Sequence, residues 1–587
     1  MPSTHEISAP AAPTKPDDSK SESNRGEVIM VSGDRLRRFS DPVDVVEAFE
    51  PGDVVSALHR LADLVSQGYT VVGYLAYEAA SAFEEAMVTH SSTEQPLLWF
   101  GVYGSVQETA VEDFGGSPDS SLSCEAALDE QAFTAKIDRI HEYIAAGDTY
   151  QVNFTFPLSL KYTEEAVPLF HRLCRGQDAA YQTYIDTGRY KILSMSPELF
   201  FKLDGTHLFT KPMKGTAKRG LTAASDRLQA DGLAGSAKDR AENIMIVDLL
   251  RNDMGRISET GTVKVEQQFE VERYPTLWQM TSTISSQTRV DVPEIFAALF
   301  PSGSVTGAPK IRTMEIINEL ESGPRGVYCG AVGWWGPDRQ AEFSVAIRTA
   351  TVDGKTKSMT YPVGAGITWD SSADGEYGEC LLKAKVLDAA ISSFDLLESL
   401  LWDGDFFLLD RHLARLGESA AYFGYIFDEA HVRRELDRAV TGLCVQPMKV
   451  RLLLSKRGDV AIKAQAMEPL RVQRISLAQH PVDENDVFLY HKTTNRGVYD
   501  TALDGVSGMD DVLLWNSRGE ITESTRANVG VKLDGVWVTP PVESGLLAGT
   551  YRAALIEDGT LTEQVVRVED MKRAESVRLF NSVRAWI

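Results

Sequence analysis

The stretches Lys-Pro-Met-Lys-Gly-Thr at residues 211–216 and His-Lys-Thr-Thr-Asn-Arg at residues 491–496 define the organisation of this sequence. Each stretch is centred on a lysine, and the two have little else in common. A lysine amine becomes a nucleophile once it has lost its proton, so each stretch indicates a separate covalent chemistry. We therefore expect the chain to carry out two steps of one pathway.

Lys214, in the first stretch, lies between Pro212 and Gly215, two residues with special backbone requirements. Neighbouring positive charges disfavour the ammonium form of a lysine. We expect three of them to lower the pKa of Lys214: Lys211, Lys218 and Arg219. On this hexapeptide alone, a solvated basic loop is an equal alternative.

A chain of 587 residues is too long for a single ordinary core and indicates roughly two to four domains. Its formal net charge of −25 argues against a nucleic-acid-binding surface, which needs clustered Lys and Arg, although a local basic pocket can still bind small anions. No uninterrupted apolar run has the length that spans a bilayer, and no apolar stretch follows a basic start at the N-terminus. We expect a cytoplasmic protein that binds neither nucleic acid nor membrane.

The cysteines show no paired spacing, and their odd number cannot form a closed set of disulfides. None lies in a Gly-x-Cys-x-Gly turn, the kind that presents the nucleophile of glutamine amidotransferases. If the protein uses ammonia, another chain must release it. The five are Cys124, Cys174, Cys329, Cys380 and Cys444.

The sequence divides into a tail and two domains. Residues 1–27 are rich in Pro, Ser, Thr, Asp and Lys and lack a periodic apolar pattern, which indicates a disordered tail. Over residues 28–392, strand and helix signals are mixed, with a hairpin turn at Asp204 and Gly205 and a helix that begins after Ser236. Both this domain and a smaller one over residues 393–587 are predicted to be α+β.

Hairpin signals dominate the smaller domain. Residues 394–400 and 406–409 are predicted to be two strands joined by a tight turn at residues 401–405. Two further hairpins are expected around residues 457–459 and 534–535.

Three carboxylates of the first domain have local patterns that suit chemistry. Glu198 follows an apolar strand, where burial would let it protonate a leaving hydroxyl group. Glu242 and Glu379, on two predicted helices, would suit a hard cation such as Mg²⁺. Taken singly, an exposed glutamate and surface salt bridges are the better explanations.

Six motifs of the first domain occur together and in order. They are Gly-Asp-Thr-Tyr-Gln-Val-Asn at 147–153, Ser-Pro-Glu at 196–198, the hexapeptide at 211–216, Glu-Asn at 242–243 with the run at 247–253, Gly-Ser-Val-Thr-Gly-Ala-Pro-Lys at 303–310, and Gly-Ala-Gly at 364–366. As a set they resemble the chorismate-utilising enzymes over about residues 28–390.

That resemblance implies the fold of the family, with large mixed β-sheets and helices. It implies that Mg²⁺ holds the ring carboxylate of chorismate through Glu242 and Glu379, supported by Glu376. Tyr328 and Arg348 match positions that hold the enolpyruvyl carboxylate, for which a planar guanidinium is well shaped. Without the neighbouring motifs, Arg348 would be an ordinary strand arginine. The other substrate contacts implied are Thr216, Gly364, Gly366 and Lys383.

Lys214 distinguishes between branches of this family. Members that make anthranilate or isochorismate usually carry a small residue there, whereas the aminodeoxychorismate synthase branch carries lysine. The resemblance implies that Lys214 attacks C2 of chorismate while Glu198 protonates the departing C4 hydroxyl, after which ammonia adds at C4 and releases the lysine. Gln279 replaces a histidine of anthranilate-forming relatives, which fits an enzyme that stops before pyruvate is eliminated.

Four motifs of the second domain, at residues 410–416, 492–496, 523–529 and 547–550, also occur in order. Singly they would be an amphipathic helix, a basic loop, a polar turn and a helix start. Together they resemble the fold-type IV pyridoxal phosphate enzymes, and among these the aminodeoxychorismate lyases.

This second resemblance implies a pyridoxal 5'-phosphate site. Lys492 would bind the aldehyde of the cofactor, Glu523 its ring nitrogen, and Arg415 its phosphate together with the amides of Gly549 and Thr550. Lys492 would also act as the acid and base that removes the C4 proton, so that pyruvate leaves and the ring becomes aromatic.

The sequence therefore predicts a bifunctional enzyme that converts chorismate into 4-amino-4-deoxychorismate and then into 4-aminobenzoate for folate. A separate glutamine amidotransferase subunit is the expected partner, and a homodimer through the C-terminal domain is a further expectation. Three alternatives remain: an aminotransferase as the second domain, an anthranilate synthase-like enzyme, and a non-catalytic regulator that binds chorismate.

Overall fold

The computed structural model of the chain describes residues 25–33, 35–91, 94–110, 124–162, 165–177, 179–384, 387, 394–442, 446–467, 472, 474–506 and 508–587. Most of the predicted tail, residues 1–24, and the predicted domain boundary at residues 392 and 393 lie outside the described residues. The chain forms two compact units. Unit 1 comprises Met1–Thr216 and Leu233–Ile391, and unit 2 comprises Ala217–Gly232 and Ser392–Ile587.

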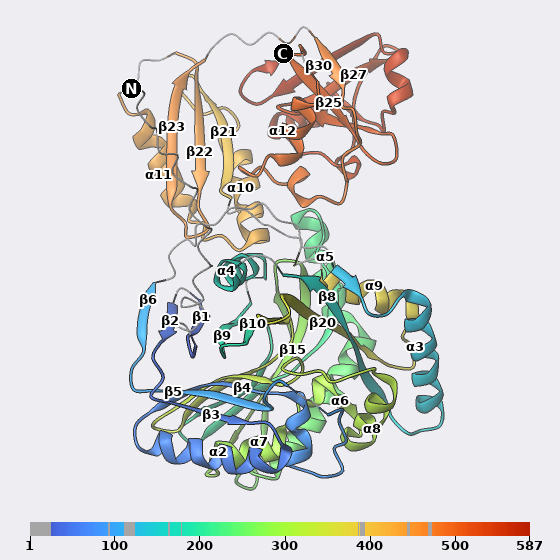
Figure 1. Cartoon of the computed structure of the whole chain (residues 1–587). Coiled ribbons are helices and arrows are strands. Elements are labelled where there is room, and N and C mark those ends of the chain that lie inside the picture. The colour runs from blue at the N-terminus through green and yellow to red at the C-terminus, as the bar shows by residue number, and fades with distance from the viewer. Residues whose placement is uncertain are drawn as a thin grey trace, which may run out of the picture. The chain divides into compact units, whose positions relative to one another are not determined.

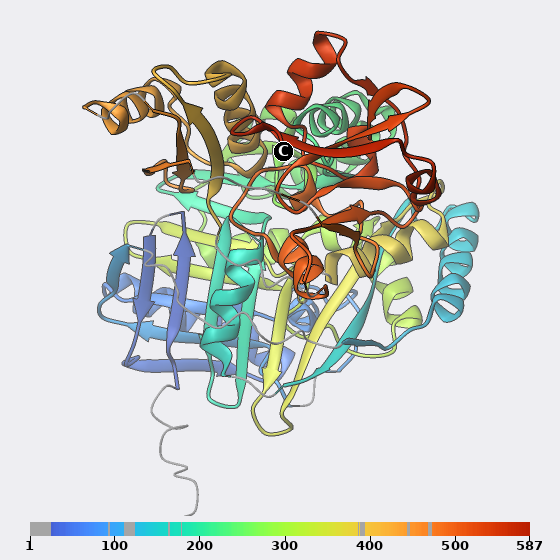
Figure 2. The same cartoon turned by 90° about the horizontal axis from the view of Figure 1, so that it is seen from above.

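Unit 1 is built on two antiparallel sheets of ten strands each (Figure 1). In pairing order, the first contains β16 (Gly307–Ala308), β8 (Gln151–Lys161), β20 (Ser358–Ile367), β19 (Thr349–Asp353), β10 (Tyr190–Ser196), β9 (Tyr181–Asp186), β1 (Val28–Ser32), β2 (Arg35–Phe39) and β6 (Gln107–Ala110), with β7 (Cys124–Ala126) beside β8. Figure 2 shows these strands side by side in the order β2 and β1 (blue), β9 and β10 (teal), and β19 and β20 (yellow).

The second sheet carries the strand of the first lysine motif. In pairing order it contains β13 (Met213–Lys218), β15 (Leu277–Gln287), β12 (His207–Lys211), β11 (Leu199–Asp204), β18 (Gln340–Val345), β17 (Ala331–Gly336), β4 (Thr70–Leu75), β5 (Leu98–Tyr103) and β3 (Asp44–Ala48), with β14 (Lys264–Arg273) beside β15. The predicted hairpin at Asp204 and Gly205 is confirmed as the turn between β11 and β12.

Helices cover the sheets of unit 1 and bury its two main apolar clusters. α2 (Pro51–Ser66) lies over β3, β4 and β5 and contacts α7 (Val292–Leu299), while α3 (Glu130–Ala145) and α9 (Ala373–Ala384) pack together beside β20. α4 (Ala166–Gln177) lies on β9 and β10, and α8 (Lys310–Leu320) on β8. Phe343 on β18 contacts three other aromatic rings within the core, two of them edge to face, and such aromatic pairs add to the energy of burial.

The predicted helix after Ser236 is confirmed as α6 (Ala237–Gly255). The hydroxyl group of Ser236 accepts a hydrogen bond of 3.2 Å from the backbone N–H of Asp239, which caps the first turn. This cap fixes the start of the helix that carries Glu242.

Unit 2 begins with a three-stranded sheet of β21 (Leu396–Trp402), β22 (Met448–Leu454) and β23 (Val460–Ala466), on which α10 (Leu409–Phe423) and α11 (Glu429–Val440) pack. The rest contains β24 (Ile475–Leu477), α12 (Gly497–Asp504), β25 (Asp511–Trp515), β26 (Ile521–Ser524), β27 (Asn528–Leu533), β28 (Val536–Thr539), α13 (Thr550–Glu557), β29 (Thr562–Glu563), β30 (Ser576–Asn581) and β31 (Ala585–Trp586). The hairpins predicted at residues 457–459 and 534–535 join β22 to β23 and β27 to β28.

The strand predicted at residues 406–409 does not form. A single bridge joins Trp402 to Phe406, and α10 begins at Leu409. Two features decide this: Leu408 has a left-handed φ of 56°, and the apolar residues that follow recur at helical spacing, as in Leu413 and Leu416. The apolar run at residues 406–409 is too short to distinguish a strand from a helix by its pattern. The longer helical pattern of the residues that follow determines that a helix forms.

Both units combine helices and antiparallel strands, so the predicted α+β class is confirmed. Among the described residues, no helix has both the length and the hydrophobicity that a membrane crossing requires.

Candidate active sites

Unit 1 contains a cavity of about 270 Å³, lined by residues from both of its sheets and from α6 and α9. A volume of this order is suited to a small ring compound. The lining includes every residue of unit 1 that the sequence assigns to a site: Glu198, Lys214, Thr216, Glu242, Tyr328, Arg348, Gly364, Gly366, Glu376, Glu379 and Lys383. Residues that are far apart in the sequence therefore meet around one space.

Lys214 and Glu198 both line this cavity. Lys214 lies on β13, and Glu198 lies between β10 and β11. Glu198 is only 3 % exposed, and burial raises its pKa to about 7, opposed by Ser304 and by the charge of Lys214. A carboxyl group of this kind holds its proton near neutral pH, so the alternative of an exposed surface glutamate is excluded.

Burial also lowers the pKa of Lys214, as the sequence predicts, but the predicted cause is wrong. After burial, the charges that act on it are those of Glu242 and Glu198, which raise the pKa, and of Lys383, which lowers it. The flanking cations are engaged elsewhere: Lys211 pairs with Glu272, and Arg219 pairs with Asp226 in unit 2.

Gln151 is a lining residue that the sequence analysis did not assign to a site. Neither the nitrogen nor the oxygen of its buried side-chain amide has a hydrogen-bond partner. A Cβ atom added to Gly366 would lie 2.3 Å from this nitrogen and 3.0 Å from Nζ of Lys214. Gly366 therefore leaves room for both groups, and the free amide of Gln151 is available to a ligand.

Arg348 lies in a backbone conformation that favours glycine, with a φ of 50°. Within the described residues, no carboxylate lies within salt-bridge distance of its guanidinium group, which stacks 5.9 Å from the ring of Tyr274. Tyr328 is 7 % exposed and lines the same cavity. A cation without a counter-charge beside a buried phenol is suited to receive a substrate carboxylate.

Glu242, Glu376 and Glu379 approach the cavity from α6 and α9. Burial raises the pKa of Glu242 and Glu376, whereas Lys383 lowers the pKa of Glu379, with which it forms an ion pair of 2.9 Å. Among the described residues, no three His, Cys, Asp or Glu side chains are close enough to hold a metal ion by themselves.

These carboxylates nevertheless fit Mg²⁺, which is usually held by one or two protein carboxylates and completed by water or substrate oxygens. Burial makes the ionised forms of Glu242 and Glu376 unfavourable. A divalent cation beside these two carboxylates would stabilise their ionised forms. Lys383 also donates a hydrogen bond of 2.8 Å to the carbonyl of Gly364, so this lysine joins α9 to β20.

Gln279 has a structural contact that explains its presence. Its side-chain N–H donates to the carbonyl of Gly215 at 2.9 Å, and its side-chain oxygen accepts from the hydroxyl group of Thr216 at 3.2 Å. The amide therefore fixes the strand segment that follows Lys214. An amide has no titratable proton for base catalysis, as the sequence analysis anticipated.

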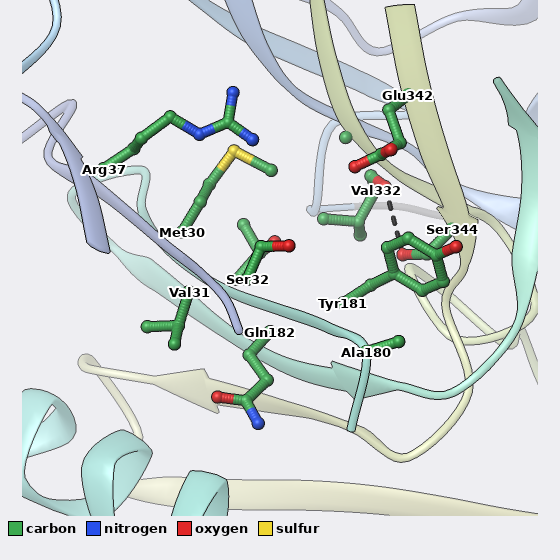
Figure 3. A pocket seen from close by; sticks show the side chains of 12 residues that line it. Met30, Val31, Ser32, Arg37, Ala180, Tyr181, Gln182, Val332, Glu342 and Ser344 are labelled. Carbon is green, nitrogen blue, oxygen red and sulfur yellow. Dashed lines mark hydrogen bonds between the residues drawn. The ribbon is translucent and has the colours of Figure 1, made fainter. Parts of the chain in front are cut away.

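A second hollow of unit 1 is much smaller (Figure 3). It encloses about 10 Å³, which is about the space of one water molecule. Arg37 stacks 4.9 Å from the ring of Trp334 near it, and the hydroxyl group of Ser344 donates to the carbonyl of Val332. None of the predicted catalytic residues lines it, so the larger cavity is the candidate active site.

In unit 2, Lys492 precedes α12 and lies beside β21. Burial, assisted by the positive charge of Arg415, lowers its pKa to about 8. At neutral pH a larger share of this lysine is therefore deprotonated than of a solvated lysine, as a covalent bond to a carbonyl group requires.

Glu523 on β26 is 4 % exposed, and burial raises its pKa to about 7. Three groups donate to its carboxylate: the hydroxyl of Tyr499 at 2.9 Å, the side-chain amide of Asn528 at 3.2 Å and the backbone N–H of Leu547 at 3.2 Å. A carboxylate fixed in this way would be stabilised by a protonated ring nitrogen.

Arg415 on α10 is held by Glu398 on β21 through two hydrogen bonds of 2.8 and 2.7 Å. Nδ1 of His412 donates to the same carboxylate at 2.7 Å, and its other ring nitrogen lies 3.2 Å from the hydroxyl of Thr550. Burial acts to raise the pKa of Glu398, but Arg415 and His412 together lower it to about 2. The sequence analysis did not identify Glu398, although a charged residue inside an apolar strand is a signal.

The residues of unit 2 fit pyridoxal phosphate. α13 begins at Thr550 as predicted, with Gly549 as its N-cap, and the first N–H groups of such a helix suit a phosphate. A Cβ atom on Gly549 would lie 2.0 Å from the side-chain oxygen of Asn528, so a larger residue here would displace the amide that donates to Glu523. Arg415 has a further N–H directed to the carbonyl of Ala548, next to this helix start.

Comparison with known proteins matches two separate stretches of the chain to two different families. The chorismate binding enzyme family matches residues 109–389, and the family described as amino-transferase class IV matches residues 395–587. Aminodeoxychorismate synthase component 1 of Bacillus subtilis is 32% identical over 405 residues, which are 62% of this chain and 84% of that protein. The chain belongs to the chorismate-binding enzymes and carries a class IV amino-transferase domain at its C-terminal end.

Other relatives come from two branches. Aminodeoxychorismate synthase component 1 of Salmonella typhimurium is 40% identical over 42% of this chain and 54% of that protein. Anthranilate synthase component 1 of Neisseria gonorrhoeae is 36% identical over 48% of this chain and 55% of that protein. The crystal structure of anthranilate synthase component I from Streptococcus pneumoniae has a TM-score of 0.53 and 25% identity, covering 66% of this chain and 95% of that one.

Gly366→Ala should reduce chorismate turnover by about 100-fold, because the methyl group displaces the side-chain amide of Gln151 by roughly an ångström and also presses on Nζ of Lys214. The measurement is the steady-state rate with chorismate and ammonium, together with the thermal unfolding midpoint. Gly378→Ala on α9 is the control, since its Cβ would meet nothing within 4 Å. Equal rates for the two variants would contradict the assigned geometry.

Proposed function

We propose that this chain makes 4-aminobenzoate from chorismate in two steps, one in each unit. The main support for this proposal is that Lys214 and Glu198 line the same cavity. The pKa of Lys214 is lowered, as a nucleophilic amine needs, and that of Glu198 is raised, as a proton donor needs. A chorismate-binding enzyme with a class IV domain fits this scheme, because the product of the first reaction is the substrate of the second.

In the first step, Nζ of Lys214 forms a bond to C2 of chorismate while Glu198 gives its proton to the C4 hydroxyl, which leaves as water. Ammonia then bonds to C4, and the bond between Lys214 and C2 breaks as the ring double bonds return. Arg348 and Tyr328 hold one substrate carboxylate. Glu242, Glu376 and Glu379 would hold Mg²⁺, which supplies positive charge to the other carboxylate.

In the second step, 4-amino-4-deoxychorismate loses a proton from C4 and then pyruvate, which leaves an aromatic ring. Pyridoxal phosphate, when bound, supplies the electron sink that makes this proton acidic. Lys492 would bind its aldehyde and afterwards move the C4 proton, Glu523 would hold its ring nitrogen, and Arg415, Gly549 and Thr550 would hold its phosphate.

Two features favour amination at C4 over an anthranilate synthase-like reaction. Lys214 occupies the cavity as a desolvated amine, which permits two successive displacements. Gln279 is engaged with Gly215 and Thr216 and offers no base for the elimination that forms anthranilate. Incubating the purified chain with chorismate, ammonium, Mg²⁺ and pyridoxal phosphate should give equal amounts of 4-aminobenzoate and pyruvate.

Other products would identify the alternatives. Anthranilate would indicate the anthranilate synthase-like enzyme, and 2-oxoacids formed from amino acids without 4-aminobenzoate would indicate an aminotransferase as the second domain. Binding of chorismate without turnover would indicate a regulator.

Lys214→Ala should abolish formation of 4-amino-4-deoxychorismate, because ammonia then has no covalent lysine to displace. Chorismate binding in the presence of Mg²⁺ should persist in a calorimetric titration. Lys211→Ala is the matched control, since Lys211 pairs with Glu272 and does not line the cavity. Unchanged turnover by Lys214→Ala would refute its assignment as the nucleophile.

Glutamine should fail as a nitrogen donor for the isolated chain, whereas ammonium at high pH should succeed, because the sequence has no amidotransferase cysteine motif. We propose that a separate glutaminase subunit supplies the ammonia. Initial rates with each donor, with and without such a subunit, measure this. Steady glutamine-driven turnover by the pure chain would contradict it.

Lys492→Ala should separate the two reactions. The wild-type protein should show a visible absorbance band from its cofactor, which borohydride reduction attaches to Lys492, and the variant should lose this linkage. With chorismate and ammonium, the variant should accumulate 4-amino-4-deoxychorismate. Added Lys214→Ala protein, whose second site is unaltered, should convert that product to 4-aminobenzoate, and undiminished 4-aminobenzoate from Lys492→Ala alone would exclude this role.

A further inference from the structure

Five positively charged side chains, Lys449 and the four arginines around it, gather in unit 2. Apart from burial, the influences that lower the pKa of Lys449 are the charges of four arginines: Arg451, Arg584, Arg496 and Arg526. Arg496 also acts on both Lys492 and Glu523. In a chain with a net charge of −25, such a concentration of positive charge runs against the overall composition.

The segment that contains Lys492 pairs with β21. Leu396 forms a bridge with Thr493, and the backbone N–H of Leu397 donates to the carbonyl of Lys492 at 2.9 Å. Lys492 is therefore directly opposite Leu397. Residues that are directly opposite in an antiparallel pair have their side chains on the same face.

β21 lies next to β22 (Figure 1), and the register of this pair places two of the cations on the same face as well. Leu401 lies on the same face of β21 as Leu397, because four residues separate them and side chains alternate along a strand. Lys449 is opposite Leu401, and Arg451 lies two residues further along β22. Lys449 and Arg451 therefore share a sheet face with Lys492.

Arg496 and Arg526 approach from the segments that carry the other candidate cofactor contacts. The guanidinium of Arg496 donates to the carbonyl of Thr525, next to Arg526, at 2.5 Å and lies 4.7 Å from the ring of Tyr499. The hydroxyl group of Tyr499 in turn donates to Glu523. Tyr499 therefore links Arg496 to the carboxylate assigned to the cofactor ring.

Among the described residues, four of these five cations, all but Arg584, form no salt bridge. In the described part of the chain, no carboxylate lies within salt-bridge distance of Lys449, Arg451, Arg496 or Arg526. Lys449 and Arg496 are half-buried, whereas Arg451 and Arg526 are exposed. Like charges that are close together repel one another, most strongly where burial limits their hydration, so they destabilise the folded state. An anionic ligand would remove that repulsion.

We propose that Lys449, Arg496 and Arg526 form a receptor for the carboxylates of the substrate of the second site, which they hold beside Lys492. The ligand class is a ring compound with two carboxylates. This inference rests on the proposed function, in which 4-amino-4-deoxychorismate carries two carboxylates and each product carries one. The receptor therefore holds the substrate more tightly than either product and favours release after cleavage.

The test uses Lys449→Gln and Arg526→Gln in the full-length protein loaded with pyridoxal phosphate. Each should raise the KM for 4-amino-4-deoxychorismate about tenfold or more, the value of a charge-assisted hydrogen bond, with kcat changed less than about twofold. The affinity for pyridoxal phosphate, measured by fluorescence titration, should be unchanged. Lys463→Gln is the control, because Lys463 is exposed on β23 opposite Arg451, one strand further from Lys492.

A KM equal to that of the wild type in both variants would overturn the receptor. A matching loss of cofactor affinity would also overturn it, because the cluster would then serve the phosphate.

A binding measurement separates this inference from the proposed function. Isophthalate, with two ring carboxylates, and benzoate, with one, are titrated against the cofactor absorbance of the Mg²⁺-free protein. Preference for isophthalate that Lys449→Gln abolishes supports the receptor even if the wild type does not cleave 4-amino-4-deoxychorismate, in which case only the lyase function fails. Absence of this preference in the wild type overturns the receptor.

Discussion

The loss of hydration that a lysine suffers on burial governs both candidate sites. Lys214 in unit 1 and Lys492 in unit 2 have lowered pKa values, and in both cases burial is the largest cause. An ammonium ion in poorly hydrated surroundings gives up its proton more readily, which leaves the nucleophilic amine. The two units share no fold, yet each uses the same physical means to make a lysine reactive.

Each of these lysines has a buried carboxyl group as its counterpart. Burial raises the pKa of both Glu198 and Glu523 to about 7, so their protonation responds to a nearby ligand. Glu198 keeps a proton that it can transfer, whereas Glu523 is fixed by three donors and would ionise beside a cationic ring. The same shift therefore suits an acid in one unit and an anchoring anion in the other, because the surrounding hydrogen bonds differ.

Several groups in the two units remain without a protein partner, and these point to ligands. The amide of Gln151 has no hydrogen-bond partner, and Arg348 has no carboxylate within salt-bridge distance among the described residues. In unit 2, the half-buried Lys449 likewise has no carboxylate within salt-bridge distance among the described residues. Buried polar groups are normally paired in folded proteins, so such groups are retained where a ligand completes them.

Much of this could be predicted from the sequence, because the information is local. Regular signals such as the cap at Ser236, the turn at Gly205 and the helix start at Thr550 depend on neighbouring residues, and the structure has all three. The ordered motifs likewise predicted which residues of unit 1 would line one cavity. The apolar run at residues 406–409, in contrast, is too short for its pattern to distinguish a strand from a helix. The structure has a helix here, which begins after the left-handed residue Leu408.

Burial and pairing of charges were decided by the tertiary structure alone. The sequence placed Lys211 and Arg219 beside Lys214, but folding paired them with Glu272 and Asp226 and left burial to set its pKa. Glu398 became the partner of Arg415 and His412 only when β21 met α10. The sequence by itself determined which reactive groups are present and in what order. Their ionisation depends on contacts between distant segments, and those exist only in the folded chain.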